Sequence, residues 1–184
     1  MDDILIVFHD PSRCMTQLTE KYYEKEESIG PPKIYLGSTF KKVTDRSGKQ
    51  AWASSSDKYV KEAVEVAFTR ARAMNLKLQS CTKSPTNPFS NIKYRPELDV
   101  SDPCNASEHQ FYLQLIGMSR WMIELGRLDI NMEIALLSRY MAAPRRGHLT
   151  QLLHIFQYLH SHRCMDLTFD PIKINVNENT ALPQ

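Results

Sequence analysis

The chain has 184 residues, of which 42% are hydrophobic and 24% are charged, values typical of a globular protein with a substantial core. It contains no run of about 18 apolar residues, so we predict no transmembrane helix and no membrane partner. A formal net charge of +2 at pH 7 is too small to indicate nucleic-acid binding by itself.

The first residues combine charge and hydrophobicity in an unusual way. Asp2 and Asp3 directly precede the apolar run Ile4–Phe8, which we expect to form a strand buried on both faces, with the two aspartates at a tight turn before it. Two adjacent carboxylates repel each other unless a cation neutralises them. A divalent ion that prefers oxygen ligands, such as Mg²⁺, would do so. The simpler alternative is a solvated chain end.

The next part of the chain predicts a helix, a hairpin and a second helix. Asp10 and Pro11 are typical of a helix start, and Gly30 of a stop. Gly37 inside a predicted strand indicates a bulge or a close backbone approach, with a weak point in the sheet as an equal alternative. In chain order we expect a helix from Pro11 to about Glu24, strands Ile34–Phe40 and Gln50–Ser54, and a helix from Ser56 as N-cap to about Met74.

Residues 75–106 contain four prolines and predict a long irregular connection at a subdomain boundary. Three amphipathic helices should follow and pack as a small bundle. They span 107–125, with a capping box of Ser107 and Gln110, then Asp129 to a point before Pro144, then Gly147 to about 162. Met165–Phe169 alternates like a half-buried strand, and Asn177–Gln184 reads as disordered.

Cysteine and histidine spacing does not indicate a metal or disulfide framework. Cys14, Cys81, Cys104 and Cys164 are far apart and predict free thiols in a reducing compartment. The run His160-Ser161-His162-Arg163-Cys164 has no second ligand cluster at zinc spacing. We therefore interpret it as a polar helix end, where basic side chains suit the helix dipole.

Several blocks carry a family resemblance. Asp2-Asp3 and the apolar run after them resemble the catalytic turn of reverse transcriptases, with Met1 in the position before the aspartates. Residues 115–130, followed by Leu137–Met141, resemble the block after the catalytic region in copia-type retrotransposon polyproteins, and Tyr35-Leu36-Gly37 is similar to their primer-gripping hairpin. The resemblance covers roughly residues 1–170, and its blocks keep the family's order.

The resemblance implies an α+β fold in which a partial polymerase palm precedes a thumb-like helical bundle. Residues 1–74 would form the rear of the palm, 75–106 a Pro-rich connection, 107–162 the thumb-like region, and 163–184 a connecting strand and tail. The parent element would place the protein in the cytoplasm within a virus-like particle, or in the nucleus.

The resemblance also implies an RNA-directed DNA polymerase. Asp2 and Asp3 would be its catalytic residues and Mg²⁺ ligands, and Tyr35, Leu36 and Gly37 would hold the primer. The implied partners are an RNA template, a DNA primer and the remainder of the polymerase. The residues expected to contact the nucleic-acid backbone are Lys41, Lys42, Arg145 and Arg146.

The chain departs from the family in lacking the third catalytic aspartate and the fingers, so we expect the isolated chain to be inactive. Two alternatives stay open: a non-catalytic nucleic-acid-binding or interaction remnant, and a decayed transposon reading frame.

Overall fold

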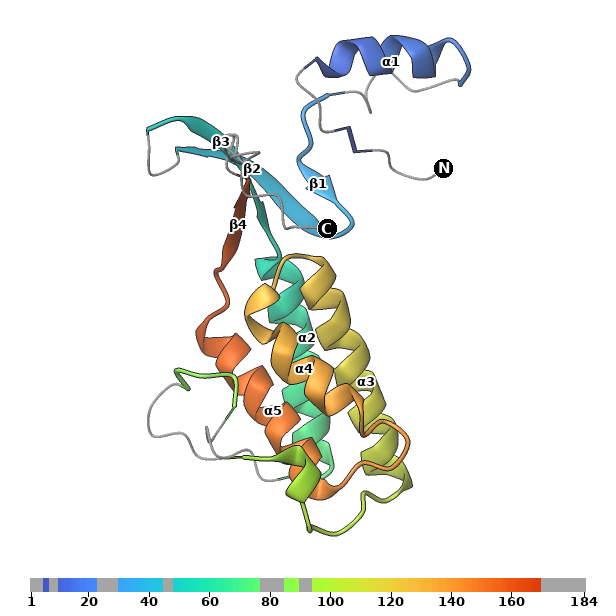
Figure 1. Cartoon of the computed structure of the whole chain (residues 1–184), viewed down its shortest axis with the longest axis vertical. Coiled ribbons are helices and arrows are strands. Elements are labelled where there is room, and N and C mark those ends of the chain that lie inside the picture. The colour runs from blue at the N-terminus through green and yellow to red at the C-terminus, as the bar shows by residue number, and fades with distance from the viewer. Residues whose placement is uncertain are drawn as a thin grey trace, which may run out of the picture.

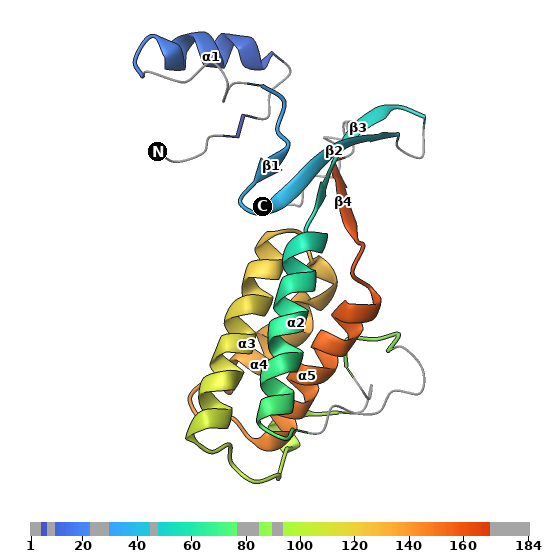
Figure 2. The same ribbon diagram turned by 180° about the vertical axis from the view of Figure 1, so that it is seen from behind.

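Four helices enclose the core in the computed structural model, which describes residues 5–6, 10–22, 30–44, 48–76, 85–89 and 94–169. Their inward side chains form one apolar cluster of mostly fully buried residues. Figures 1 and 2 show α2, α3 and α5 side by side along their length. The four are α2 (Asp57–Ala73), α3 (Ala106–Glu124), α4 (Asn131–Ser138) and α5 (Arg146–Ser161).

The expected bundle of three helices therefore has α2 as a fourth member. The inward face of α2 repeats at helical spacing, with Val60, Val64, Ala67 and Ala71 at most 2% exposed. Small residues on this face allow the backbone of α2 to approach its neighbours closely. The helix before the long connection thus shares its core with the helices after it, while the division into palm-like and thumb-like parts stays a prediction.

A four-stranded antiparallel sheet extends from one end of the bundle, in the order β1-β2-β3-β4 (Figure 1). Its strands are β1 (Ile34–Tyr35), β2 (Ser38–Thr44), β3 (Gln50–Ser55) and β4 (Asp166–Phe169). β3 leads through Ser56 into α2, whereas β4 follows α5, so the sheet joins segments from both ends of the chain. The α+β fold class is confirmed.

The predicted strand Ile34–Phe40 is in fact a tight hairpin. Leu36 and Gly37 connect β1 to β2 with φ angles of +49° and +90°, and Tyr35 pairs with Ser38 across the turn. Positive φ at both central residues is what a type I′ turn requires, and glycine adopts it without strain. The predicted bulge at Gly37 is therefore wrong, because the glycine serves a turn.

The helix at the N-terminus is shorter than expected. α1 spans Pro11–Thr19, and Tyr22, which lies within the predicted helix, is 62% exposed. Asp10 occupies the N-cap position, but its carboxylate accepts a hydrogen bond from the Ser12 hydroxyl, and no backbone amide bonds to it. The Thr19 hydroxyl donates to the Met15 carbonyl, a contact that slightly destabilises a helix.

Two predicted helix caps also differ from the structure. The capping box of α3 is formed by Asn105 and Glu108 rather than by Ser107 and Gln110, with hydrogen bonds of 2.9 and 2.8 Å in the two directions. A carboxylate is the stronger acceptor for an orphan amide, and it also binds a cation across the bundle. Asp129 does not cap α4, because it binds Arg127.

Other boundaries are close to expectation. Ser56 precedes α2 as predicted, although its hydroxyl is buried without a hydrogen-bond partner. β4 begins at Asp166, and only Leu167 of its four residues is half-buried. Leu5 and Ile6 are half-buried and lie outside any strand, while the rest of the predicted strand Ile4–Phe8, Cys81 and the tail Asn177–Gln184 lie outside the described residues.

A buried ion pair fixes the turn between α3 and α4. Gly126 ends α3 with φ +105°, and the amides of Gly126 and Arg127 bond back to Ile123 and Met122 as in a Schellman motif. The guanidinium of Arg127 is fully buried and donates to both carboxylate oxygens of Asp129, at 2.9 and 2.7 Å. Burial raises the pKa of Asp129, but the Arg127 hydrogen bonds and charge outweigh it, so the pKa lies below its usual value.

We predict that Arg127→Leu lowers the unfolding free energy by about 3 kcal/mol, because it leaves the partly buried Asp129 carboxylate without its partner. Urea unfolding at pH 7 would measure the loss. The double variant Arg127→Leu/Asp129→Leu is the control and should recover most of it. A single variant as stable as the wild type would contradict the assigned role.

The ion pair of Arg127 and Asp129 also predicts that the stability of the fold falls at acidic pH. A carboxyl whose pKa is lowered in the folded state stabilises the fold fully above its unfolded pKa, and this stabilisation disappears as pH falls through the folded value. Wild-type stability should therefore fall between about pH 5 and pH 2, with a smaller slope in Asp129→Asn. Equal slopes for both proteins would exclude Asp129 as the titrating group.

Candidate nucleic-acid interface

Five of the residues predicted to contact nucleic acid lie in the β1–β2 hairpin. Tyr35, Leu36 and Gly37 form the end and turn of the β1–β2 hairpin, and Lys41 and Lys42 lie further along β2. Leu36 is 54% exposed at the tip, whereas Tyr35 is half-buried. Asp2 and Asp3 lie outside the described residues, so their role as Mg²⁺ ligands stays a prediction.

The sheet is positively charged. The described parts of residues 33–55 contain Lys33, Lys41, Lys42 and Lys49 and no aspartate or glutamate. Asp166 on β4 is the acidic residue of the strands, and its carboxylate lies 2.5 Å from the Lys41 ammonium. Their hydrogen bond raises the pKa of Lys41 and lowers that of Asp166. A surface with this balance attracts anions, including nucleic-acid phosphates.

Aromatic rings gather on one face of the sheet. Trp52 on β3 pairs in register with Lys42 on one side and Phe169 on the other, and the Lys42 ammonium lies 5.5 Å from the Trp52 ring centre. The rings of Phe40 and Phe169 are nearly parallel, with centroids 6.5 Å apart. We refer to Phe40, Trp52 and Phe169 as the aromatic strip.

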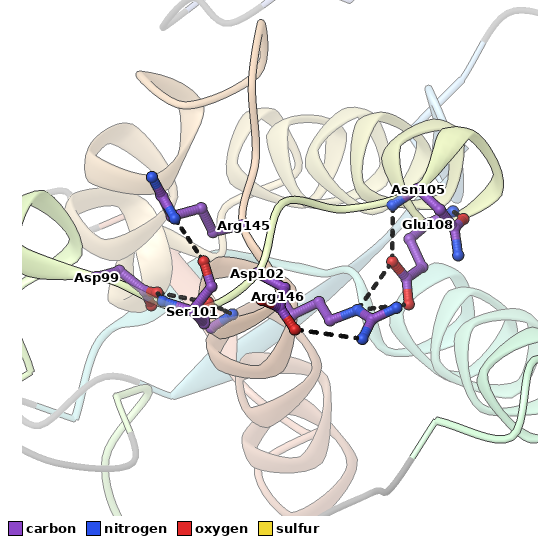
Figure 3. A network of polar contacts seen from close by, with 8 residues as sticks. Asp99, Ser101, Asp102, Asn105, Glu108, Arg145 and Arg146 are labelled. Atoms are coloured by element: carbon purple, nitrogen blue, oxygen red, sulfur yellow. Dashed lines mark hydrogen bonds and ion pairs between the residues drawn. The ribbon is translucent and has the colours of Figure 1, made fainter.

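The two predicted arginine contacts are engaged inside the protein (Figure 3). The Arg145 guanidinium donates to the Ser101 carbonyl at 2.5 Å. Arg146 donates to the Glu108 carboxylate at 3.2 Å, and its guanidinium also lies 3.9 Å from Asp102. Both arginines thus hold the connection before α3 against the start of α5, and their contact with a nucleic-acid backbone stays a prediction.

The same connection is bound to α5 through Asp99 (Figure 3). Its carboxylate accepts hydrogen bonds from the Tyr94 hydroxyl at 2.7 Å and from the amide and hydroxyl of Ser101 at 2.9 and 2.5 Å. Burial raises the pKa of Asp99, but these hydrogen bonds outweigh it and lower the pKa overall. The Gly147 amide then donates to the Ser101 hydroxyl at 2.7 Å. The later part of the predicted irregular connection is therefore ordered by specific polar contacts.

A second cationic feature lies between α2 and α5. A groove of about 420 Å³ runs between the helices, with buried Val60, Val64 and Leu159 among its lining residues. Its charged residues include Lys61, Arg72 and Arg163 together with Glu65.

α2 carries four basic residues, Lys58, Lys61, Arg70 and Arg72. Arg70 binds Gln114 and lies over the Phe111 ring, while Arg163 reaches Asp57 at 2.8 Å. The number of basic residues on α2 was the sequence signal for a cationic surface there. The groove itself could not be predicted, because α5 forms its other wall.

Within the described residues, no group of three or more histidine, cysteine, aspartate or glutamate side chains could hold a metal ion. His160 lies against Phe68, and His162 stacks on Tyr158 with ring centres 4.4 Å apart. Cys164 points to Asp57, with sulfur and oxygen 3.7 Å apart, and Cys14 and Cys104 are also free thiols. Among the same residues, no helix combines the length and hydrophobicity needed to cross a membrane.

Comparison with known proteins identifies a relative among mobile elements. The chain is 25% identical over 172 residues to a Saccharomyces cerevisiae protein described as "Putative transposon Ty5-1 protein YCL074W". The match covers 92% of this chain and 50% of the relative, so the chain spans about half the relative's length. The chain is a distant relative of this transposon protein. No protein-family model matches the sequence, and no solved structure matches it.

The polar network around Asp99 predicts that Gly147 has no tolerated replacement. A β-carbon at Gly147 would overlap the Asp99 carboxylate, whereas one at Gly117 in α3 would meet nothing within 4 Å. Gly147→Ala should therefore lower the unfolding free energy by about 1–3 kcal/mol. The matched control Gly117→Ala should raise it by about 0.5–1 kcal/mol, because alanine favours the helix. Thermal unfolding measures both, and a stabilising Gly147→Ala would refute the predicted clash.

Proposed function

We propose that the chain is part of the reverse transcriptase of a copia-type retrotransposon, comprising the rear of the palm and a thumb-like helical region. One observation carries the proposal: the match to a transposon protein runs through 92% of the chain. Because the match leaves only a short part of the chain unaligned at its ends, the matched span includes both the Tyr35-Leu36-Gly37 block and the 115–130 block. These are the segments whose residues resemble the copia-type family.

In this proposal the sheet contacts the template and primer. The β1–β2 turn at Leu36 and Gly37 would approach the primer's 3′ end, and Lys42 would contact its phosphates. The adjacent lysines Lys41 and Lys42 on β2 support this role, because cations there attract the backbone phosphates. The groove between α2 and α5 offers Lys61 and Arg72 as further phosphate contacts.

The proposed parent reaction is DNA synthesis on an RNA template. The primer's 3′-hydroxyl attacks the α-phosphate of a deoxynucleotide, forming a phosphodiester and releasing pyrophosphate. Asp2 and Asp3 would hold Mg²⁺, which supplies charge neutralisation and activation of the hydroxyl in such reactions. The proposed partners are the template, the primer and the remainder of the polymerase, and the proposed location is a cytoplasmic virus-like particle or the nucleus.

We expect the chain to bind an RNA–DNA hybrid with an affinity that falls as salt rises, because cations on the protein release counterions from the phosphates. Lys42→Gln should weaken binding and reduce the slope of log K against log salt by about 1. Arg72→Gln tests the groove in the same way. Fluorescence anisotropy with a labelled hybrid measures both.

The matched control is Lys21→Gln, which neutralises an exposed lysine just after α1 and should leave the slope unchanged. Binding that is independent of salt, or absent at low salt, would contradict the proposal.

We also expect the isolated chain to show no polymerase activity, because the family's third catalytic aspartate has no counterpart in its 184 residues. Primer extension on an RNA template with Mg²⁺ and deoxynucleotides should give no product. Magnesium-dependent synthesis that disappears in Asp2→Asn would show that the carboxylates present are sufficient.

The second candidate is a non-catalytic nucleic-acid-binding protein derived from such an element. It is favoured by the groove between α2 and α5, whose charged lining residues include Lys61, Arg72 and Arg163 with Glu65, since such a surface can hold phosphates without a metal ion. This candidate is favoured if Asp2→Asn leaves hybrid binding unchanged and the chain gives no primer extension when it is joined to the fingers and front palm of a copia-type reverse transcriptase.

A further inference from the structure

The aromatic strip is assembled by strand pairing from distant parts of the sequence. Lys42, Trp52 and Phe169 are direct neighbours across β2, β3 and β4, so their side chains emerge on the same face. Phe40 lies two residues before Lys42 and shares that face. Its cross-strand partner is Ser54, whose small side chain allows the Phe40 ring to reach across β3 and stack on Phe169.

The rings are accessible. Phe169 is 48% exposed, and Phe40 and Trp52 are half-buried. Figures 1 and 2 show that the bundle helices lie at the end of the sheet and none of them covers the strands β2, β3 and β4 across their width. The solvated face of an antiparallel sheet is normally polar. Three aromatic side chains on this open face therefore indicate a role other than packing within the sheet.

Charge is divided between the two faces of the sheet. By register, the face that carries the aromatic strip holds Lys42 and, in its described residues, no aspartate or glutamate. The opposite face holds the ion pair of Lys41 and Asp166, which neutralises both charges. The aromatic face is therefore cationic, and it presents rings beside a lysine that already lies over one of them.

We propose that the aromatic strip binds unpaired nucleotides of a single strand, with bases stacked on Phe169 and Trp52 and a phosphate held by Lys42. Rings on an open sheet beside cations bind single strands in this way, because every base has an exposed π face. A duplex buries those faces in its own stack and offers only phosphates. The inference rests on the proposed function in that it takes a nucleic acid as the ligand, and it adds a preference for unpaired strands.

The test uses the full chain and its own tryptophans. The sequence has two, Trp52 and Trp121, so Trp121→Phe leaves Trp52 as the only tryptophan, located within the strip. Oligo(dT) and oligo(U) are titrated against this variant, with a blunt RNA–DNA hybrid in parallel. We expect the single strands to quench Trp52 fluorescence, and the hybrid to bind with little quenching.

Two replacements of one residue separate stacking from packing. Phe169→Leu keeps an apolar side chain and removes the ring, and it should weaken single-strand binding about 5- to 10-fold, the low end of the range for one stacked base. Phe169→Ala should weaken it at least as much. Met132→Ala, an exposed apolar residue on α4, is the matched control and should leave affinity unchanged. Hybrid binding should persist in all three variants.

The outcomes are distinct. Loss of single-strand binding in Phe169→Leu with hybrid binding intact supports the inference. Equal single-strand affinity in Phe169→Leu and wild type, or no quenching of Trp52, overturns it while leaving the proposed function in place if the hybrid still binds. Failure of every nucleic acid to bind at low salt overturns both.

Discussion

The ion pair of Arg127 and Asp129 connects the parts of this fold. Its guanidinium is fully buried, a position that an arginine occupies only with its charge and hydrogen bonds satisfied. Besides Asp129 it reaches the carbonyl of Arg163, 3.5 Å away in the segment between α5 and β4. Tyr158 of α5 contributes to lowering the pKa of Asp129. One short turn after α3 therefore fixes the end of α5 and the start of β4.

The sheet depends on that connection because β4 comes from the far end of the chain. Gly126, in the same turn, lies so close to Leu167 that a β-carbon there would be 3.3 Å from the leucine. Once β4 is positioned, it places Asp166 beside Lys41 and Phe169 beside Trp52. The end of the helical bundle thus determines two features of the sheet. One is the separation of charge between its two faces, and the other is the aromatic strip.

The basic residues fall into two groups that their sequence neighbourhoods do not distinguish. Arg145 and Arg146 are adjacent and are engaged by Ser101, Glu108 and Asp102 within the chain. The exposed Lys42 lies over the Trp52 ring and forms no ion pair within the described part of the chain, so its charge is available to a ligand that approaches the sheet. A cation available to a phosphate is a property of tertiary contacts, which explains why clustering in the sequence is a weak guide to binding.

The sequence by itself determined the approximate positions of α2, α3 and α5 and of β3 and β4, because helical spacing, turn residues and strand alternation are local properties. It also carried the resemblance that agrees with the transposon relation. Tertiary structure decided what local patterns do not contain: that α2 joins the bundle, that Asn105 rather than Ser107 caps α3, and that Asp129 pairs with Arg127. It also brought Phe169 to Trp52 across more than half the chain, since strand pairing depends on long-range packing rather than on neighbouring residues.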